Sequence, residues 1–288
     1  MSAPGSITAS PPFSPRTVLW LLRRSVVAAF EDGCFSIAKG AAYSALLSFF
    51  PVLTSAAAIL VQTKAEFVSQ TIEGFLSEIV PPGTEDLVLR QFRAAGARPT
   101  ALLVGAGLIS LWAASSVIKS LMEGFQAAYR VPRSRGFLRR SGVAIALVLL
   151  VTVPLVGASL LILFGDEVER QVLRWMQAGP SSWPWLSHGF RIAVAFATTV
   201  LVTALLYYFG PYRRQRWRYV WPGAILATVL WLGTTSGFGW YVRHMGNYNV
   251  MYGSVGAGIA LLVWMYLLAA IALIGCEFNA EYERSIRH

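Results

Sequence analysis

The chain is poor in charge: Asp, Glu, Lys and Arg make up 13% of its 288 residues, about half the share of an ordinary soluble domain. The stretches that contain none of these residues are Ala41–Val61, Ala101–Ile118, Gly142–Phe164, Ile192–Phe209, Val220–Val242 and Val255–Cys276. A helix rises about 1.5 Å per residue, so each stretch can cross a hydrocarbon core of about 30 Å. The sequence therefore predicts an all-α polytopic membrane protein with six transmembrane helices. It excludes a soluble enzyme, a disordered chain and a β-barrel porin, whose strands alternate apolar and polar residues.

The chain also has few of the residues that build catalytic or metal centres. Its three histidines, His188, His244 and His288, have no metal-ligand spacing. The Gly-rich phosphate loop and the Gly-x-Ser-x-Gly elbow of hydrolases are absent. Cys34 and Cys276 are too few for a disulfide framework, and we expect both to be buried free thiols. We therefore expect a protein that is not an enzyme, with no catalytic residue, no metal and no cofactor.

The net charge of +10 has a topological origin. Six spans put both termini on one side, whose segments hold 16 cations and 6 acids, whereas the opposite side holds 8 of each. The positive-inside rule places the richer side, and so both termini, in the cytoplasm. The turn Tyr212–Tyr219 is decisive because it holds four arginines between two spans. The charge therefore indicates no nucleic acid, and the expected partner is the lipid bilayer with its anionic headgroups.

The segments around the spans suggest a simple organisation. Residues 1–16 are predicted to be a disordered tail, residues 17–283 a single six-span membrane domain, and residues 284–288 a C-terminal tail. Thr17–Ala38 reads as one amphipathic helix at the cytoplasmic interface. In the outer loop Gln62–Thr100 we expect two short amphipathic helices. Gly246–Ser254 is expected to be a polar re-entry between the last two spans.

The fifth span carries small residues four apart. Gly223 and Ala227 begin this pattern, and Gly233 and Gly237 continue it. Small side chains let helix backbones approach closely in lipid. We expect packing within the chain here. A dimer face or an unwound stretch beside a cavity is the alternative.

Polar residues and a proline near the spans are the candidates for a substrate pathway. Lys119 and Glu123 lie one helical turn apart, so they can form an ion pair or anchor the helix at the interface. Charge near membrane depth usually marks function. Glu277 and Asn279 form a comparable polar cluster at the inner end of the sixth span, which can also be the C-terminal region of a helix that meets water. The full candidate set is Tyr43, Pro51, Lys119, Glu123, Asn247, Tyr248, Asn249, Tyr252, Glu277 and Asn279.

Several segments together resemble the YihY/virulence factor BrkB family. They are the run Ala41–Pro51, the Tyr208-Phe209-Gly210-Pro211 end of the fourth span, Trp221-Pro222-Gly223-Ala224, and the closing run from Tyr248 to Glu281. The resemblance implies a six-span protein of the bacterial cytoplasmic membrane. The family has carried the label ribonuclease BN, regarded as a misassignment, and the label virulence factor. Some members are suspected of moving lipids, lipopolysaccharide precursors or small solutes. The family has no agreed catalytic residues to carry over.

These observations favour a transporter or exporter of a lipid or small solute. Proline-broken spans at Pro51 and Pro154, a Gly/Thr-rich fifth span and polar clusters at span ends are features that line cavities. The alternative is a non-transporting membrane protein of envelope biogenesis, with a second copy of itself or an envelope-assembly protein as partner. A ribonuclease is the least favoured reading. A polar cavity between spans one, three, five and six would support transport, whereas a filled bundle would support the partner role.

Overall fold

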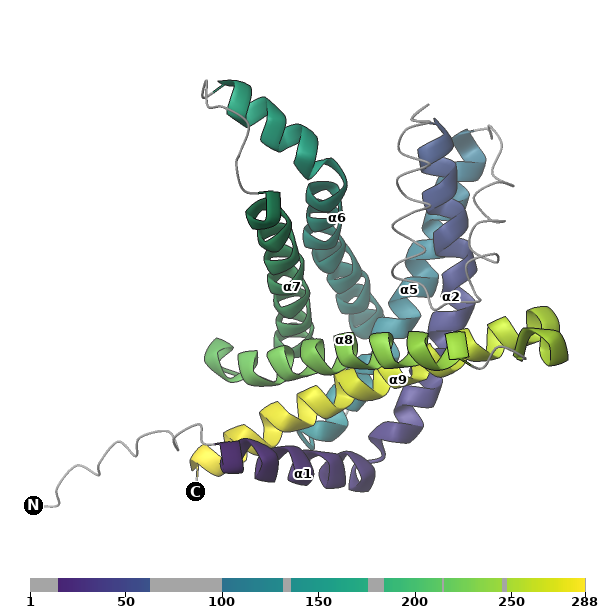
Figure 1. Cartoon of the computed structure of the whole chain (residues 1–288). Coiled ribbons are helices and arrows are strands. Elements are labelled where there is room, and N and C mark those ends of the chain that lie inside the picture. Colours follow the sequence, from purple (N-terminus) through teal and green to yellow (C-terminus); the bar gives the residue numbers. More distant parts are fainter. Residues whose placement is uncertain are drawn as a thin grey trace, which may run out of the picture.

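The computed structural model describes residues 15–62, 100–131, 136–175, 184–213, 215–244 and 248–287, and these residues form no β-strand. The helices are α1 (Pro15–Glu31), α2 (Cys34–Gln62), α5 (Thr100–Ala128), α6 (Phe137–Trp175), α7 (Pro184–Phe209), the 3-10 turn η1 (Trp217–Tyr219), α8 (Trp221–His244) and α9 (Tyr248–Arg287). Six of them are long and apolar enough to cross a membrane. The predicted all-α, six-span architecture is therefore confirmed (Figure 1).

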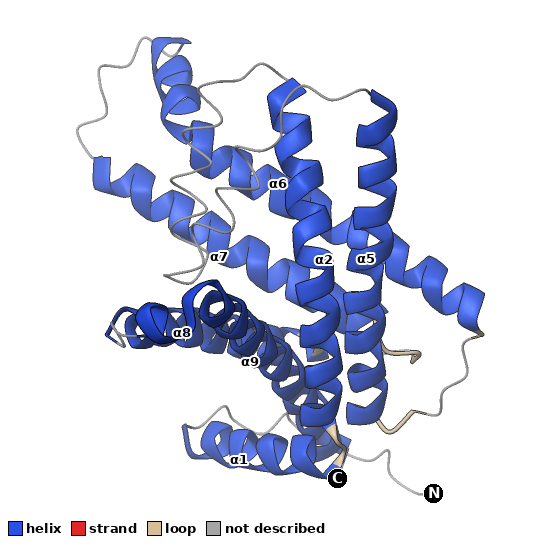
Figure 2. Ribbon diagram, turned by 90° about the vertical axis from the view of Figure 1, so that its right-hand side faces the viewer, coloured by secondary structure: helices blue, strands red, loops and turns tan. Residues whose placement is uncertain are grey.

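The helices form three antiparallel pairs, α2 with α5, α6 with α7, and α8 with α9. All three pairs meet at one end, which we call the base: α2, α6 and α8 begin there, and α5, α7 and α9 end there. Away from the base, the α6–α7 pair leans away from the α2–α5 pair, and α8 and α9 run across both (Figures 1 and 2). The two ends of the chain, α1 and the last turns of α9, both lie at the base, as an even number of spans requires (Figure 1).

The predicted single helix over Thr17–Ala38 is wrong, because the structure divides it into α1 and the start of α2. Gly33 lies between them with a φ of +71°, a left-handed conformation that residues with a side chain rarely adopt. The Asp32 N–H closes α1 by donating to the Ala28 carbonyl oxygen at 2.8 Å. The break turns α1 across the base (Figure 1), where Leu21 packs against Phe278 and Tyr282 of α9.

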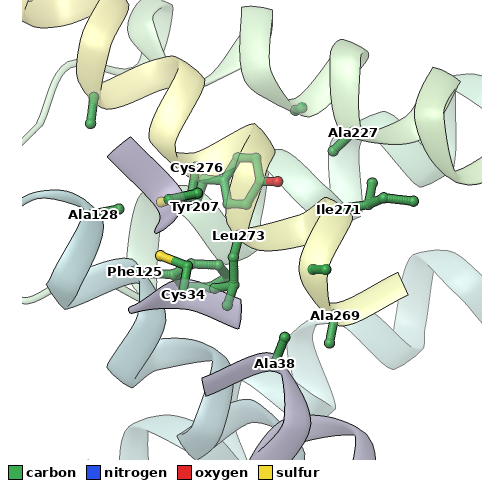
Figure 3. Packing of buried hydrophobic residues seen from close by; sticks show 14 of the residues in the cluster. Cys34, Ala38, Phe125, Ala128, Tyr207, Ala227, Ala269, Ile271, Leu273 and Cys276 are labelled. Carbon is green, nitrogen blue, oxygen red and sulfur yellow. The ribbon is translucent and has the colours of Figure 1, made fainter. Parts of the chain in front are cut away.

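The main core lies at the base and is built largely from alanine. Its large members include Phe125, Tyr207 and Leu273, which come from α5, α7 and α9 (Figure 3). The rings of Phe125 and Tyr207 meet edge to face with centroids 5.4 Å apart, and the Tyr207 hydroxyl donates to the Ala272 carbonyl oxygen at 2.6 Å. Helix association in lipid depends on close van der Waals packing. The small residues therefore let five membrane helices converge at one place.

The small-residue pattern of the fifth span packs only in its first half. A Cβ on Gly223 would overlap the Gly275 carbonyl oxygen, and one on Gly275 would lie 2.8 Å from Ala227. By contrast, a Cβ on Gly233 or Gly237 would have no atom within 4 Å. The expected packing within the chain is therefore present at the base end of α8 and absent further along.

Three other segment predictions have different outcomes. The expected re-entry over Gly246–Ser254 is helical from Tyr248 onward, because α9 begins there. Helix α6 runs through Pro154 and continues to Trp175, well beyond the predicted end of its span at Phe164. The two short helices expected in the outer loop fall on residues 63–99, outside the described residues.

Candidate functional site

The last turns of α9 carry four polar side chains into the interior of the base. Glu277, Asn279, Glu281 and Glu283 are all buried, and the first two have no exposed surface. Successive members of this set are two residues apart, so they point to different sides of the helix. All of them can be buried because α9 is surrounded at the base by α1, α2, α5 and α8.

Glu277 is a fully buried carboxylate without an ion-pair partner in the described part of the chain. Its Oε1 accepts a hydrogen bond from the Cys34 thiol, with 3.6 Å between sulfur and oxygen. Its Oε2 is buried and has no hydrogen-bond partner among the described residues. Cys34 and Cys276 are both free and buried, as the sequence predicts, and both belong to the core at the base (Figure 3). A buried acidic group without an ion-pair partner is costly and so calls for a functional explanation.

Asn279 joins α9 to the start of α8. Its Oδ1 accepts a hydrogen bond from the Gly223 N–H at 2.7 Å, and its Nδ2 donates to the Val220 carbonyl oxygen at 3.0 Å. The first N–H groups of a helix have no partner within the helix, so Asn279 acts as a cap supplied from another helix. The absence of a side chain at Gly223 lets α9 approach closely enough for these bonds. Two segments that are separated in the sequence, Trp221–Ala224 and the end of the closing run, thus form one contact.

Glu281 and Glu283 hold the surrounding elements to α9 through ion pairs. Glu281 binds Arg24 of α1, whose Nε lies 2.5 Å away, and it also binds Arg284. Glu283 binds Arg213, which follows α7, at 2.6 Å. The two carboxylates are almost fully buried, whereas Arg24 is half exposed and Arg213 partly exposed, so the pairs are screened by water from the arginine side only and link α1, α9 and the segment after α7.

A cavity of about 300 Å³ opens beside this network. The residues that line it are Tyr129, Val131, Arg213, Ala280, Glu283 and Arg284. The Tyr129 hydroxyl is buried and has no hydrogen-bond partner among the described residues. The Arg213 guanidinium lies over the Tyr129 ring, 4.9 Å from its centroid. Burial, reinforced by the nearby Glu283 carboxylate, raises the pKa of the Tyr129 phenol well above its ordinary value. The phenol therefore stays protonated and can donate a hydrogen bond.

Of the candidate residues that the structure describes, only Glu277 and Asn279 lie in this site. Tyr43 lies on α2 with 61% of its surface exposed, and the Pro51 carbonyl oxygen accepts a hydrogen bond from Ser110 of α5 at 2.7 Å. Tyr248, Asn249 and Tyr252 lie on the first turns of α9, at the opposite end of that helix. Asn247 lies outside the described residues.

The ion pair that the spacing of Lys119 and Glu123 allows is not formed, because Glu123 binds another residue. Glu123 binds Arg140 of α6 at 2.5 Å, and the same guanidinium donates to the Lys119 carbonyl oxygen at 2.7 Å. An arginine can bridge both groups because its guanidinium carries five N–H donors in one plane. The pair thus joins α5 to α6 instead of linking two residues of one helix.

Sequence reasoning missed Tyr129, Arg213, Glu281, Glu283 and Arg284. Charged residues beyond the end of a span resemble solvated connectors, and nothing local shows that another segment will cover them. One signal was available. Glu281 and Glu283 are acids in a region of the chain that is otherwise rich in arginine, which suggests that they are internal partners for the basic loops.

Comparisons with known proteins agree with the membrane architecture. The family model described as Virulence factor BrkB matches residues 26–288. The ribonuclease-like protein YfkH of Bacillus subtilis is 29% identical over 246 residues, which cover 83% of this chain and 86% of that protein. A UPF0761 membrane protein of Tolumonas auensis is 27% identical over 242 residues, covering 83% of this chain and 77% of that protein. UPF0761 membrane protein Nmul_A0452 of Nitrosospira multiformis is 25% identical, and the match covers 88% of this chain but 58% of that longer protein. No solved structure matches the chain.

Proposed function

The chain belongs to the virulence factor BrkB family, and from this premise we propose that it transports or exports a lipid or small solute of the bacterial cell envelope. We place it in the cytoplasmic membrane with both termini in the cytoplasm, because the excess of Lys and Arg lies on the segments at the base. The base is then the cytoplasmic end of the protein.

The observation that carries the proposal is the buried Glu277 carboxylate. It lies at the point where five helices converge, and one of its oxygens has no partner among the described residues. A charge within a membrane protein is expensive and typically lies on the route of an ion, a proton or a polar substrate. Glu277 is therefore the first residue we assign to a pathway. The other nine candidates from the sequence stay predictions.

The test is transport by the purified protein in proteoliposomes. Lipid movement is followed with a fluorescent phospholipid that a reducing agent can reach on one leaflet only, and solute movement with a panel of radiolabelled compounds. We expect Glu277→Gln to lower the rate of transport at least tenfold, because the amide can neither bind a cation nor take up and release a proton. Glu31→Gln, which changes an exposed carboxylate at the end of α1, should stay within about twofold of the wild type. Wild-type protein that moves no class of compound, or a Glu277→Gln variant as fast as wild type, would contradict the proposal.

The alternative is a non-transporting assembly or interaction protein of the envelope. The observation in its favour is that large apolar residues away from the base, such as Leu108, Trp112 and Val153, are exposed. A partner helix or a second copy of the chain could cover them, although lipid can do so equally well. A photocrosslinker at position 108 in intact cells distinguishes these cases. Recovery of one defined protein partner would support the alternative, and recovery of lipid alone would argue against it.

A further inference from the structure

The cavity beside α9 presents hydrogen-bond donors from three separate elements. Tyr129 directly follows α5, Arg213 lies in the segment after α7, and Arg284 lies in the last turns of α9. We propose that this cavity binds a phosphate group, carried by an anionic phospholipid or by a soluble phosphate ester. Any role of this binding in transport rests on the proposed function, but the binding itself is measured without transport.

Tyr129 is the lining residue whose polar group lacks a hydrogen-bond partner in the described part of the protein. Its side chain is buried, with 8% of the residue's surface exposed, and its hydroxyl has no partner among the described residues. Buried hydroxyl groups are nearly always hydrogen-bonded, since an unpaired one loses its bonds to water without replacement. A ligand oxygen in the cavity would supply the missing acceptor.

Arg213 and Arg284 are held in place by other groups while part of each guanidinium remains for a ligand. Arg213 binds Glu283 through Nη2. Arg284 binds Glu281 through Nη1 and the Ala128 carbonyl oxygen through Nη2. Each guanidinium has five N–H donors in a fixed fork that matches the oxygens of phosphate. The side chains are 24% and 29% exposed, so a ligand can reach them from the surface.

The donors at the cavity, rather than its net charge, favour an anion over a cation. Arg213 is paired with Glu283 and Arg284 with Glu281, so these four groups sum to zero, and the N–H groups of the two guanidiniums that are left over are the ones that would bind an anion. The segments at this end of the bundle hold 16 cations and 6 acids in total. Arginine binds both phosphate and carboxylate, but a phosphate offers more oxygen acceptors than a carboxylate to donors that come from three different elements.

The test compares four ligands on the full-length protein in a neutral maltoside detergent. Phosphatidic acid and oleate present a phosphate or a carboxylate on a lipid, and inorganic phosphate and acetate present the same groups free in water. Affinity is measured from the rise in thermal midpoint with ligand concentration. We expect each phosphate ligand to bind at least tenfold more tightly than its carboxylate counterpart. A tighter affinity for phosphatidic acid than for inorganic phosphate identifies a lipid headgroup, whereas equal affinities identify a soluble ester.

Two matched tyrosine variants separate binding from folding. Tyr129→Phe removes a hydroxyl that has no protein partner, so the midpoint without ligand should stay unchanged while phosphate affinity falls at least threefold. Tyr207→Phe removes a hydroxyl bonded to Ala272, so it should lower that midpoint and leave the affinity unchanged. Arg213→Gln should weaken binding at least tenfold. No saturable phosphate binding, equal affinity for phosphate and carboxylate, or a Tyr129→Phe variant with wild-type affinity would each overturn the proposal.

Discussion

At the base of the bundle, Gly223 and Gly275 bring the backbones of α8 and α9 into contact, whereas Gly233, further along the same helix α8, faces open space. The same difference holds for polar groups. Buried ion pairs and the Asn279 cap tie several helices together at the base, while isolated side-chain bonds, such as Ser55 to Ser110 at 2.7 Å, join single pairs of helices away from it. The comparison teaches that several helices meet closely at the base, whereas further along the contacts join pairs of helices and many large apolar side chains are exposed.

The largest effect is expected from a substitution at the closest contact between α8 and α9. Gly223→Ala would place a methyl group against the Gly275 backbone carbonyl and the Asn279 side chain, and backbone atoms cannot move aside as a flexible side chain can. We expect a loss of more than about 3 kcal/mol in the free energy of unfolding, or no folded protein. Unfolding by dodecyl sulfate in mixed micelles measures it. Gly233→Ala is the matched control and should be neutral or stabilising by up to about 1 kcal/mol. Equal effects of the two variants would refute the difference between the two ends.

The next effect concerns ion pairs at the base. Glu281→Gln removes the carboxylate that binds Arg24 and Arg284 and leaves those cations beside a neutral, buried amide. We expect it to lower the free energy of unfolding by about 2 to 3 kcal/mol, because the carboxylate is buried although Arg24 itself is half exposed. Asp32→Asn breaks a single pair whose carboxylate is 16% exposed, against 5% for Glu281, and whose Arg130 is exposed, so it should have an effect of less than about 1 kcal/mol. The same mixed-micelle titration compares them, and a larger effect of Asp32→Asn would show that burial is not what matters.

The contact between α9 and the start of α8 should have an intermediate effect. Asn279→Ala removes both side-chain bonds and leaves the Gly223 N–H and the Val220 carbonyl buried without their partner. We expect a loss of about 2 kcal/mol. Hydrogen exchange of the first turn of α8, measured by mass spectrometry, should become faster in this variant. Unchanged exchange in that turn would argue against the capping role.

The smallest effect tests the region away from the base. Ser110→Ala removes the bonds from this side chain to Ser55 and to the Pro51 carbonyl oxygen. Hydrogen bonds between membrane helices average about 0.6 kcal/mol, so we expect a loss of less than about 1 kcal/mol. Unfolding in mixed micelles measures it against wild type. A loss as large as that of Asn279→Ala would mean that the outward halves are also fixed by polar contacts.

Predictions that depend on neighbouring residues succeeded more often than predictions that depend on contacts between distant segments. The six spans could be predicted because a run without charge is a property of neighbouring residues. The free thiols of Cys34 and Cys276 were predicted from their number and position. The break at Gly33 was missed because the amphipathic pattern continues on both sides of it. The partner of Glu123 was predicted within its own helix, whereas the structure provides Arg140 from the next one, which no spacing rule within α5 can indicate.

The sequence by itself determined the class of protein, the six spans and the segregation of charge. Each of these depends on the thickness of the hydrocarbon core and on the cost of moving charged residues across it, and both act on every span separately. Only the tertiary structure decided which polar groups are buried together. Glu277, Tyr129 and Arg213 come from three different helices or their ends, and their burial results from the close approach that glycine and alanine allow at the base. Contacts between distant segments set the surroundings of these groups, and those surroundings decide what the groups can bind.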